Sequence, residues 1–408
     1  MLHTIEASRA DGLKDIRAIH AESLFNQVIP FWESHSIDTE HGGYYSCLDR
    51  DGTVYDTDKF MWMQGREVWM FSHLYNRIRP DNRWLDYART GAVFMQTYGM
   101  DPTGKCYFSI DCAGIPQVAP YNIYADCFAA MGFAEFARAS GESSYLDLAR
   151  QLYTGIQKRK DDPKAQYNKL LPSARKFRAF GFSMIQINMA QVFRKFDDSV
   201  EYETIIEQAI DDIVKYHISE QDQIVWERVA LDGSHPDCME GRLLCPGHAC
   251  EVIWFVAKIA MERSDGQLLG KLSQALLWTL ERAWDKEFGG IYYYQDAKGF
   301  PTDKIEADMK LWWVHVEALY ATLLLYAATG EEQHYAWFRK IHDWTFSHFP
   351  DETYGEWYGY LHRDGTLAKT LKGGKWKGFF HLPRALAESI GTIDELLKIQ
   401  GVGIHEKK

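Results

Sequence analysis

Two kinds of apolar pattern alternate along the chain. Segments such as 122–139, 247–262 and 311–328 are apolar on nearly every side, which is typical of buried helices. Between them lie segments such as 145–159 and 204–217, in which apolar residues recur at three- and four-residue steps. That spacing predicts helices with a single buried face. The alternation therefore predicts pairs of helices, one buried and one amphipathic.

A short loop precedes each buried segment, and these loops resemble one another. Each combines aromatic residues, a turn glycine and a polar stretch, and the glycines are Gly52, Gly114, Gly233, Gly299 and Gly365. Their spacings are 62, 119, 66 and 66 residues, so the second spacing is nearly twice the others and predicts a degenerate copy beginning near residue 164. The chain is therefore predicted to contain six units, each a hairpin-like loop followed by two helices.

Six such units predict a specific architecture. An inner ring of buried helices inside an outer ring of amphipathic helices is an all-α (α/α)6 barrel of six helical hairpin repeats. No Pro-, Gly- or Ser-rich linker divides the chain, so we expect a single barrel domain over residues 1–408. An open helical solenoid is the structural alternative, but six units with helices at both ends favour closure.

Composition limits the classes of partner. A net charge of −12 and a pI of about 5.7 argue against nucleic acid or an anionic membrane surface. No apolar run approaches the roughly 20 residues of a membrane span, and the start of the chain lacks the pattern of a signal peptide. Seven scattered cysteines without a CxxC pair indicate reduced thiols, so we expect a cytoplasmic protein. Aromatic residues make up 14% of the chain, which fits a large core or a sugar site.

Charged residues in the buried segments indicate where the chemistry lies. In a closed barrel the loops before the inner helices all emerge at one end, so the first turns of these helices converge. Charged groups in apolar helices are costly unless they are paired or hydrogen-bonded. Those at equivalent places in four repeats are Arg66, His248, Glu251, Glu317, His381 and Arg384. We predict that they share one site, although each taken alone fits a satisfied core residue or a structural ion pair.

Further residues near the same helix starts are expected to line a substrate pocket. They are Tyr124, Asn188, Trp312, Trp313 and Trp376, although tryptophan in an inner helix is also ordinary core material. A metal site made by His248, Glu251 and His381 is the chemical alternative. Its spacing is not HExxH, no cysteine ligand set accompanies it, and nearby arginines oppose a cation, so we expect no metal.

At these residues the chain resembles the N-acylglucosamine 2-epimerase family. The motifs are MQGREVW around Arg66, GHACE at 247–251, LWWVHVEALYA at 311–321 and FFHLPRAL at 379–386. The resemblance covers nearly the whole chain, and the motifs are specific as a set. It implies an (α/α)6 barrel that interconverts sugars differing at C2, or aldoses with ketoses.

The resemblance also implies roles for the charged residues. It makes His248 and His381 catalytic, and we assign them as two acid/base groups, one for each face of C2. We assign Arg66 to the O1 oxygen of an enediolate. Glu251 and Glu317 are expected to orient the imidazoles and to bind sugar hydroxyls, and Arg384 to hold His381 or a substrate oxygen.

One position separates the subfamilies. Cellobiose 2-epimerases and the related aldose–ketose isomerases carry an additional histidine on the third inner helix, shortly after an asparagine. Here the residues after Asn188, 189–193, contain no histidine. The chain is therefore more similar to the N-acetylglucosamine 2-epimerases, which interconvert N-acetylglucosamine and N-acetylmannosamine.

Some of those enzymes are activated by ATP without consuming it. The basic loop 158–169 resembles their proposed nucleotide-binding stretch, and Lys160, Lys164 and Lys169 are its candidate contacts. Ala165-Gln166 stands where a Gly-Lys pair is expected, so a solvated basic loop is the alternative. We expect no required cofactor, ATP as the candidate activator, a small sugar as substrate and a homodimer.

Three alternative functions stay open at this point. An aldose–ketose isomerase on the same scaffold would return the proton to C1. An inverting glycoside hydrolase would use Glu251 and Glu317 as acid and base. A non-catalytic sugar-binding barrel would need no histidine on two separate helices.

Overall fold

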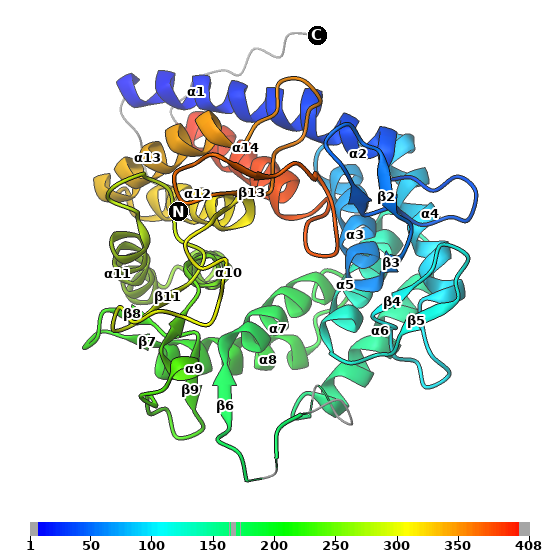
Figure 1. Cartoon of the computed structure of the whole chain (residues 1–408), viewed down its shortest axis with the longest axis horizontal. Coiled ribbons are helices and arrows are strands. Elements are labelled where there is room, and N and C mark those ends of the chain that lie inside the picture. Colours follow the sequence, from blue (N-terminus) through cyan, green and yellow to red (C-terminus); the bar gives the residue numbers. More distant parts are fainter. Residues whose placement is uncertain (1–6, 163, 165–168, 172, 400–408) are drawn as a thin grey trace.

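The molecule is a ring of helix pairs (Figure 1). The computed structural model describes residues 7–162, 164, 169–171 and 173–399. Over these residues the inner helices are α3 (Met61–Arg77), α5 (Tyr124–Ser140), α7 (Phe180–Phe193), α10 (Pro246–Glu262), α12 (Trp312–Thr329) and α14 (His381–Ile399). The outer positions are held by α1 (Ala7–Glu22), η1 (Ser23–Val28) and α2 (Ile29–His35), then by α4 (Asn82–Tyr98), α6 (Ser143–Arg159), α8 (Val200–Asp212) with η3 (Ile213–His217), α11 (Gly266–Ala283) and α13 (Glu332–His348).

Short strands surround one end of the ring, where the inner helices begin. They are β1 (Cys47–Leu48), β2 (Val54–Asp56), β3 (Lys59–Phe60), β4 (Ser109–Ile110), β5 (Pro116–Val118), β6 (Phe177–Ala179), β7 (Ile218–Ser219), β8 (Ile224–Val225), β9 (Arg228–Ala230), β10 (Leu243–Leu244), β11 (Gln295–Asp296), β12 (Lys310–Leu311), β13 (Tyr360–Leu361) and β14 (Leu367–Lys369), with the short helix α9 (Met239–Arg242) before β10. The strand that leads into an inner helix pairs antiparallel with a strand of the next repeat, as in β3–β4, β6–β9, β10–β11 and β12–β13. This pairing links successive repeats and holds the starts of the inner helices at one end.

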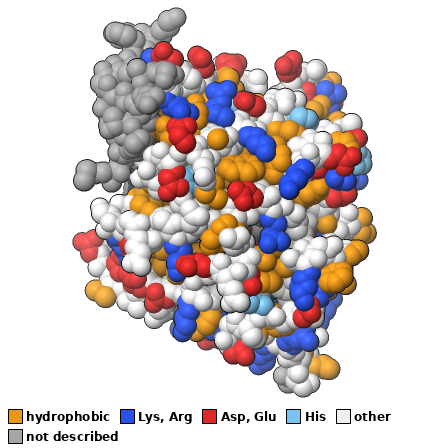
Figure 2. Space-filling model, turned by 90° about the vertical axis from the view of Figure 1, so that its left-hand side faces the viewer, with side chains coloured by type: hydrophobic (Ala, Val, Ile, Leu, Met, Phe, Trp, Pro, Cys, Tyr) orange, Lys and Arg blue, Asp and Glu red, His pale blue; other side chains and the backbone are white. Residues whose placement is uncertain are grey.

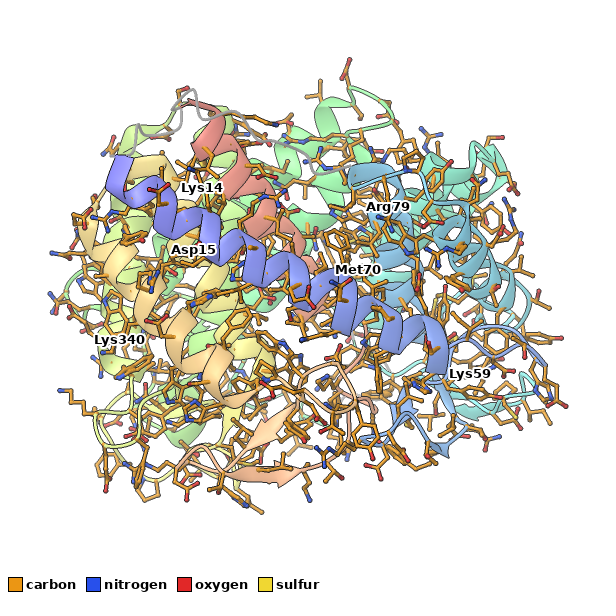
Figure 3. All side chains as sticks on the ribbon, turned by 90° about the horizontal axis from the view of Figure 1, so that it is seen from above. Lys14, Asp15, Lys59, Met70, Arg79 and Lys340 are labelled. Carbon is orange, nitrogen blue, oxygen red and sulfur yellow. The ribbon has the colours of Figure 1, made fainter. Side chains whose placement is uncertain are left out.

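The ring closes between the last repeat and the first. The backbone N–H groups of Lys372 and Gly373 donate to the carbonyl oxygen of Leu48 at 2.9 and 3.0 Å. On the outside, Arg17 of α1 forms an ion pair with Asp394 of α14 at 2.5 Å. Figure 3 shows α1 lying across the molecule beside α13 and α14. The predicted barrel is therefore closed, and the open solenoid is excluded.

The predicted turn glycines all lie in the left-handed region. Their φ angles fall between 80° and 93°, a conformation that side chains with a Cβ rarely adopt. The predicted hairpin-like loops are confirmed at these five positions. The degenerate copy near residue 164 falls partly outside the described residues, and its described end forms β6, which pairs with β9.

Helices α3 and α5 are in backbone contact beside the predicted site. A Cβ on Gly65 would lie 2.6 Å from the backbone carbonyl carbon of Phe128, and one on Gly132 would lie 2.7 Å from the oxygen of Gly65. Only glycine permits this approach. It places Arg66, the next residue of α3, against the ring of Phe128.

A buried ion pair anchors the loop before α12. Lys310 has a fully buried side chain, and its Nζ lies 3.1 Å from Oδ2 of Asp285. Asp285 also accepts hydrogen bonds from the Arg363 guanidinium at 2.8 Å and from the backbone N–H of Glu287 at 3.0 Å. These hydrogen bonds outweigh burial and hold the pKa of Asp285 below its ordinary value. The carboxylate is therefore the counter-charge that makes the burial of Lys310 tolerable.

We expect Asp285→Ala to lower the free energy of unfolding by about 3–5 kcal/mol, because Lys310 is then left buried without its counter-charge. Urea unfolding followed by circular dichroism measures this. The control is Asp11→Ala, which removes an ion pair with Lys14 whose aspartate side chain is 79% exposed, and which should change stability by less than about 1 kcal/mol. Equal losses in the two variants would contradict the assigned role of Asp285.

The outer surface mixes charges of both signs. On the face shown in Figure 2, acidic and basic side chains are interspersed rather than separated. Within the part of the chain that the structure describes, no helix has the length and apolar character that crossing a membrane requires.

Candidate active site

The predicted charged residues meet where the inner helices begin. Arg66 lies on α3, His248 and Glu251 on α10, Glu317 on α12, and His381 and Arg384 on α14. Contacts between residues more than 60 positions apart in the sequence join these helices into one polar cluster. The structure therefore brings Glu251, Glu317, His381 and Arg384 into direct contact and places Arg66 and His248 beside them.

Glu317 and Arg384 hold His381 in place. Oε1 of Glu317 lies 2.6 Å from Nδ1 of His381 and accepts a second hydrogen bond from Nη2 of Arg384, also at 2.6 Å. Its other oxygen accepts from the Trp254 indole at 2.7 Å. The same Arg384 nitrogen donates to Oε1 of Glu251 at 2.6 Å. Glu317 therefore contacts the imidazole of His381 directly, whereas Glu251 accepts from Arg384 and has a carboxylate oxygen within 4.8 Å of a ring nitrogen of His381.

The carboxylate partner of His248 is Glu227, which the sequence analysis missed. Nδ1 of His248 lies 3.1 and 3.3 Å from the two carboxylate oxygens of Glu227. Glu227 precedes β9 and lies between the buried residues Trp226 and Val229. A carboxylate within a short apolar strand pattern was the available signal. Each imidazole thus has Nδ1 on its own carboxylate, which leaves Nε2 for proton transfer.

The two imidazoles favour opposite protonation states. Burial alone would lower the pKa of His248, but the Cys245 sulfur and the Glu227 carboxylate outweigh it and raise that pKa well above the ordinary value. Burial lowers the pKa of His381 well below the ordinary value; Glu251 opposes this shift, while the Arg66 charge adds to it. At neutral pH His248 is therefore an imidazolium that can donate a proton, and His381 is a neutral imidazole that can accept one.

Arg66 is a buried cation enclosed by aromatic rings. Its guanidinium carbon lies 4.1 Å from the Phe128 ring centre, 4.5 Å from Trp62 and 4.9 Å from Phe380. Its Nε is buried without a hydrogen-bond partner, and among the described residues no carboxylate forms an ion pair with it. Burial lowers the pKa of Arg66 to about 9, with Glu251 opposing the shift, so the group is still charged at neutral pH. Such a group is available for an anionic oxygen of a bound molecule.

Trp313 lies against both imidazoles. Its ring centre is 5.1 Å from that of His248 and 5.6 Å from that of His381. Gly247 permits this contact, because a Cβ there would lie 2.6 Å from the Trp313 ring. Trp313 therefore contacts both histidines of the cluster.

The other predicted pocket residues differ in how far they are exposed to solvent. Tyr124 begins α5 and is partly exposed, Asn188 is partly exposed on α7, and Trp376 is 54% exposed and packs edge-to-face on Trp62 at 5.1 Å. Trp312 is only 2% exposed, and its ring packs on Tyr360 at 5.4 Å. The prediction that Trp312 lines the pocket is therefore wrong, because its side chain points under the β13–β14 hairpin into the core.

The candidate nucleotide contacts lie at the end of α6 and after it. Lys160, Lys164 and Lys169 are all exposed. Ala165-Gln166, which replaces the expected Gly-Lys pair, lies outside the described residues. The ATP interaction therefore stays a prediction.

The predicted alternative metal set is not assembled in the structure. Donor atoms of Glu251, Glu317 and His381 lie within 4.8 Å of one another, but Arg384 donates to both carboxylates and fills the position of a cation. His248 belongs to a different group, with Glu227 and Cys245. The arrangement as a whole can serve acid/base chemistry, because it combines two imidazoles that favour opposite protonation states with a buried cation.

Comparisons with known proteins identify the family and the fold of the chain. The family model of N-acylglucosamine 2-epimerase (GlcNAc 2-epimerase) matches residues 43–385. The chain is 36% identical to the N-acylglucosamine 2-epimerase of Bos taurus, over 91% of this chain and 90% of that protein. It is 23% identical to the cellobiose 2-epimerase of Bacteroides fragilis, over 91% of this chain and 97% of that protein. The solved cellobiose 2-epimerase of Spirochaeta thermophila DSM 6192 has the same fold, with a TM-score of 0.82 at 22% identity over 96% of this chain and 100% of that one. The chain therefore belongs to the N-acylglucosamine 2-epimerase family.

Proposed function

We propose that this protein epimerises an N-acyl hexosamine at C2, interconverting N-acetylglucosamine and N-acetylmannosamine. The observation that carries the proposal is the pair of imidazoles, each with Nδ1 on its own carboxylate, that both lie against Trp313 and favour opposite protonation states. Relatives named N-acylglucosamine 2-epimerase, 36% identical over nearly the whole chain, support this choice of substrate.

The proton transfer follows from these protonation states. In the open-chain sugar the C2 proton is α to the C1 aldehyde and is therefore acidic. Nε2 of neutral His381 takes this proton from one face, and the imidazolium of His248 returns a proton to the other face. Glu317 and Glu227 each accept the Nδ1–H of one imidazole, which fixes the tautomer and stabilises the positive charge that the ring carries in turn.

Arg66 supplies the charge that the intermediate requires. Deprotonation at C2 places negative charge on O1 of an enediolate. A guanidinium that is already buried and free of carboxylate partners stabilises this charge without reorganising. Arg384 serves a different purpose, because its Nη2 is already occupied by Glu251 and Glu317, and it positions His381 through Glu317.

The hydrolase alternative conflicts with the carboxylate geometry. Inverting glycosidases separate their two carboxyl groups by roughly 6.5–9.5 Å to admit a water molecule. Donor atoms of Glu251 and Glu317 lie within 4.8 Å of each other and both accept from Arg384. They are therefore committed to a structural network.

Proton NMR in D2O tests the proposal directly. The protein is incubated with N-acetylmannosamine, with and without ATP. Formation of N-acetylglucosamine that carries deuterium at C2 supports C2 epimerisation. A ketose product indicates the isomerase, and a bound sugar with no exchange or conversion indicates a binding protein; either result overturns the proposal. A faster rate with ATP would identify it as a non-consumed activator.

We expect the rate of epimerisation to show a broad plateau around neutral pH. At low pH His381 gains a proton and cannot act as the base, and its lowered pKa places this limb well below the ordinary histidine range. At high pH His248 loses its proton, and its raised pKa places that limb well above the range. Values of kcat/KM obtained from initial rates between pH 4 and 10 define the two limbs. The midpoint of each limb is an apparent pKa of the two coupled histidines rather than of one residue. A narrow optimum near the ordinary histidine pKa of about 6.5 would contradict the protonation states assigned here.

We also propose that the protein acts as a homodimer in the cytoplasm. The acidic composition and the seven free thiols are consistent with this location. Light scattering of the purified protein measures its oligomeric state.

A further inference from the structure

Three side chains of different chemistry converge beside the proposed acid His248. They are Glu227, Cys245 and His248, and their potential ligand atoms all lie within 4.8 Å of one another. Thiolate, imidazole and carboxylate are the three ligand types that zinc takes in proteins. A tetrahedral ion with three protein ligands retains one open position.

Cys245 lies at the start of the helix that carries His248. It is only 2% exposed and is the N-cap residue of α10, where the helix dipole favours a negative charge. His248 follows three residues later on the same helix, and its side chain is 35% exposed, so an ion can reach the cluster from the solvent. Glu227 approaches from the segment before β9.

The charge balance distinguishes this cluster from the neighbouring one. Around Glu251 and Glu317, Arg384 already supplies the positive charge. Among the described residues no lysine or arginine forms an ion pair with Glu227, whose carboxylate contacts Nδ1 of His248 instead. A thiolate and a carboxylate with a neutral imidazole carry two negative charges, which a divalent cation neutralises.

We propose that Glu227, Cys245 and His248 form a site for Zn²⁺, and that the bound ion reversibly blocks the enzyme. The coordinating nitrogen is Nδ1 of His248, the atom that faces Glu227. Coordination releases the Cys245 thiol proton and the Nδ1 proton of His248 to solvent, while Glu227 exchanges a hydrogen bond for a metal bond. An imidazole that carries the metal on Nδ1 can no longer cycle between its two protonation states. Because protons leave, the ion binds more tightly as pH rises.

The block rests on the proposed function, whereas the binding site does not. Two separate readouts therefore test them. Binding is measured with Co²⁺, since a cobalt–thiolate bond produces a charge-transfer absorption in the near ultraviolet, and Zn²⁺ is then titrated to displace it. Inhibition is measured with Zn²⁺ in the epimerase assay, followed by EDTA.

The test variant is Cys245→Ser, and the matched control is Cys112→Ser, which changes a partly exposed thiol in the loop between β4 and β5. Serine is a favourable N-cap residue, so the test variant is expected to keep α10 and the fold. We expect the wild type and the control to show the charge-transfer band and to be inhibited by Zn²⁺, with activity restored by EDTA. Cys245→Ser should lose the band and require at least about tenfold more Zn²⁺ for the same inhibition.

Three results would overturn the proposal in whole or in part. A wild-type cobalt complex without the thiolate band, or Zn²⁺ binding of equal strength in Cys245→Ser, removes the site. Zn²⁺ binding through Cys245 with undiminished epimerisation leaves the site standing and removes the block at His248. Absence of epimerisation in the metal-free wild type speaks against the proposed function alone, because the absorption band does not depend on turnover.

Discussion

The His381→Asn variant is expected to convert N-acetylmannosamine roughly 10²–10⁴-fold more slowly than the wild type, the range for loss of a general base. His381 is the imidazole that is neutral at neutral pH, because burial lowers its pKa. Asparagine retains a polar group near Glu317 but cannot accept a proton from carbon. The rate is measured by NMR, and circular dichroism checks the fold. A rate within tenfold of the wild type would remove His381 from the mechanism.

Isotope exchange separates a two-base site from a site with one base. In His248→Asn, the base His381 is retained, so the variant should still exchange the C2 proton of one epimer with D2O while forming little of the other epimer. His381→Asn should show the opposite preference for epimers at a pH high enough to leave His248 as a neutral base, because only His248 then remains. In a contrary result, the rates of C2 proton exchange and of epimerisation would fall by the same factor for both epimers in both variants. That result would contradict the assignment of one histidine to each face of C2.

The sequence predicts the barrel well because its signals are local and repeated. Positive-φ glycines recur at intervals of 62 and 66 residues, and each marks a hairpin before a buried helix. Closure was predicted from the count of repeats alone. The atoms that close the ring, such as the Leu48 carbonyl and the Lys372 backbone N–H, are too far apart in sequence for any local pattern to pair them.

Helical spacing in the sequence indicates which residues share a helix, but not which residues from other segments they contact. Trp312 and Trp313 are neighbours on a helix that is apolar all round, so the pattern does not show which indole faces the site; the packing places Trp313 there. The sequence analysis expects Glu251 and Glu317 to orient the imidazoles, without assigning a partner to His248. The observed partner, Glu227, comes from a segment before a strand, where helical spacing gives no information.

Arg66→Lys is expected to lower kcat/KM by about 10²–10³, the range for loss of a group that stabilises a developing oxyanion. Lysine preserves the charge but not the planar fork, and an ammonium is more strongly hydrated than the guanidinium that packs between Phe128, Trp62 and Phe380. Initial rates over a range of N-acetylmannosamine concentrations give kcat and KM separately. A loss confined to KM would mean that Arg66 binds the ground-state sugar and the enediolate equally.

A matched substitution distinguishes chemistry from packing. Arg79 also packs on an aromatic ring, that of Trp84 at 4.9 Å, but its side chain is 58% exposed (labelled in Figure 3). Arg79→Lys should therefore leave the rate unchanged within about twofold, since exposed cation–π contacts contribute only about 0.5–1 kcal/mol to stability. C2 proton exchange and epimerisation both pass through the enediolate. If kcat and the rate of C2 proton exchange fall by the same factor in Arg66→Lys, the guanidinium therefore acts on that intermediate. Undiminished exchange in that variant would place Arg66 after deprotonation and would overturn its assignment to O1.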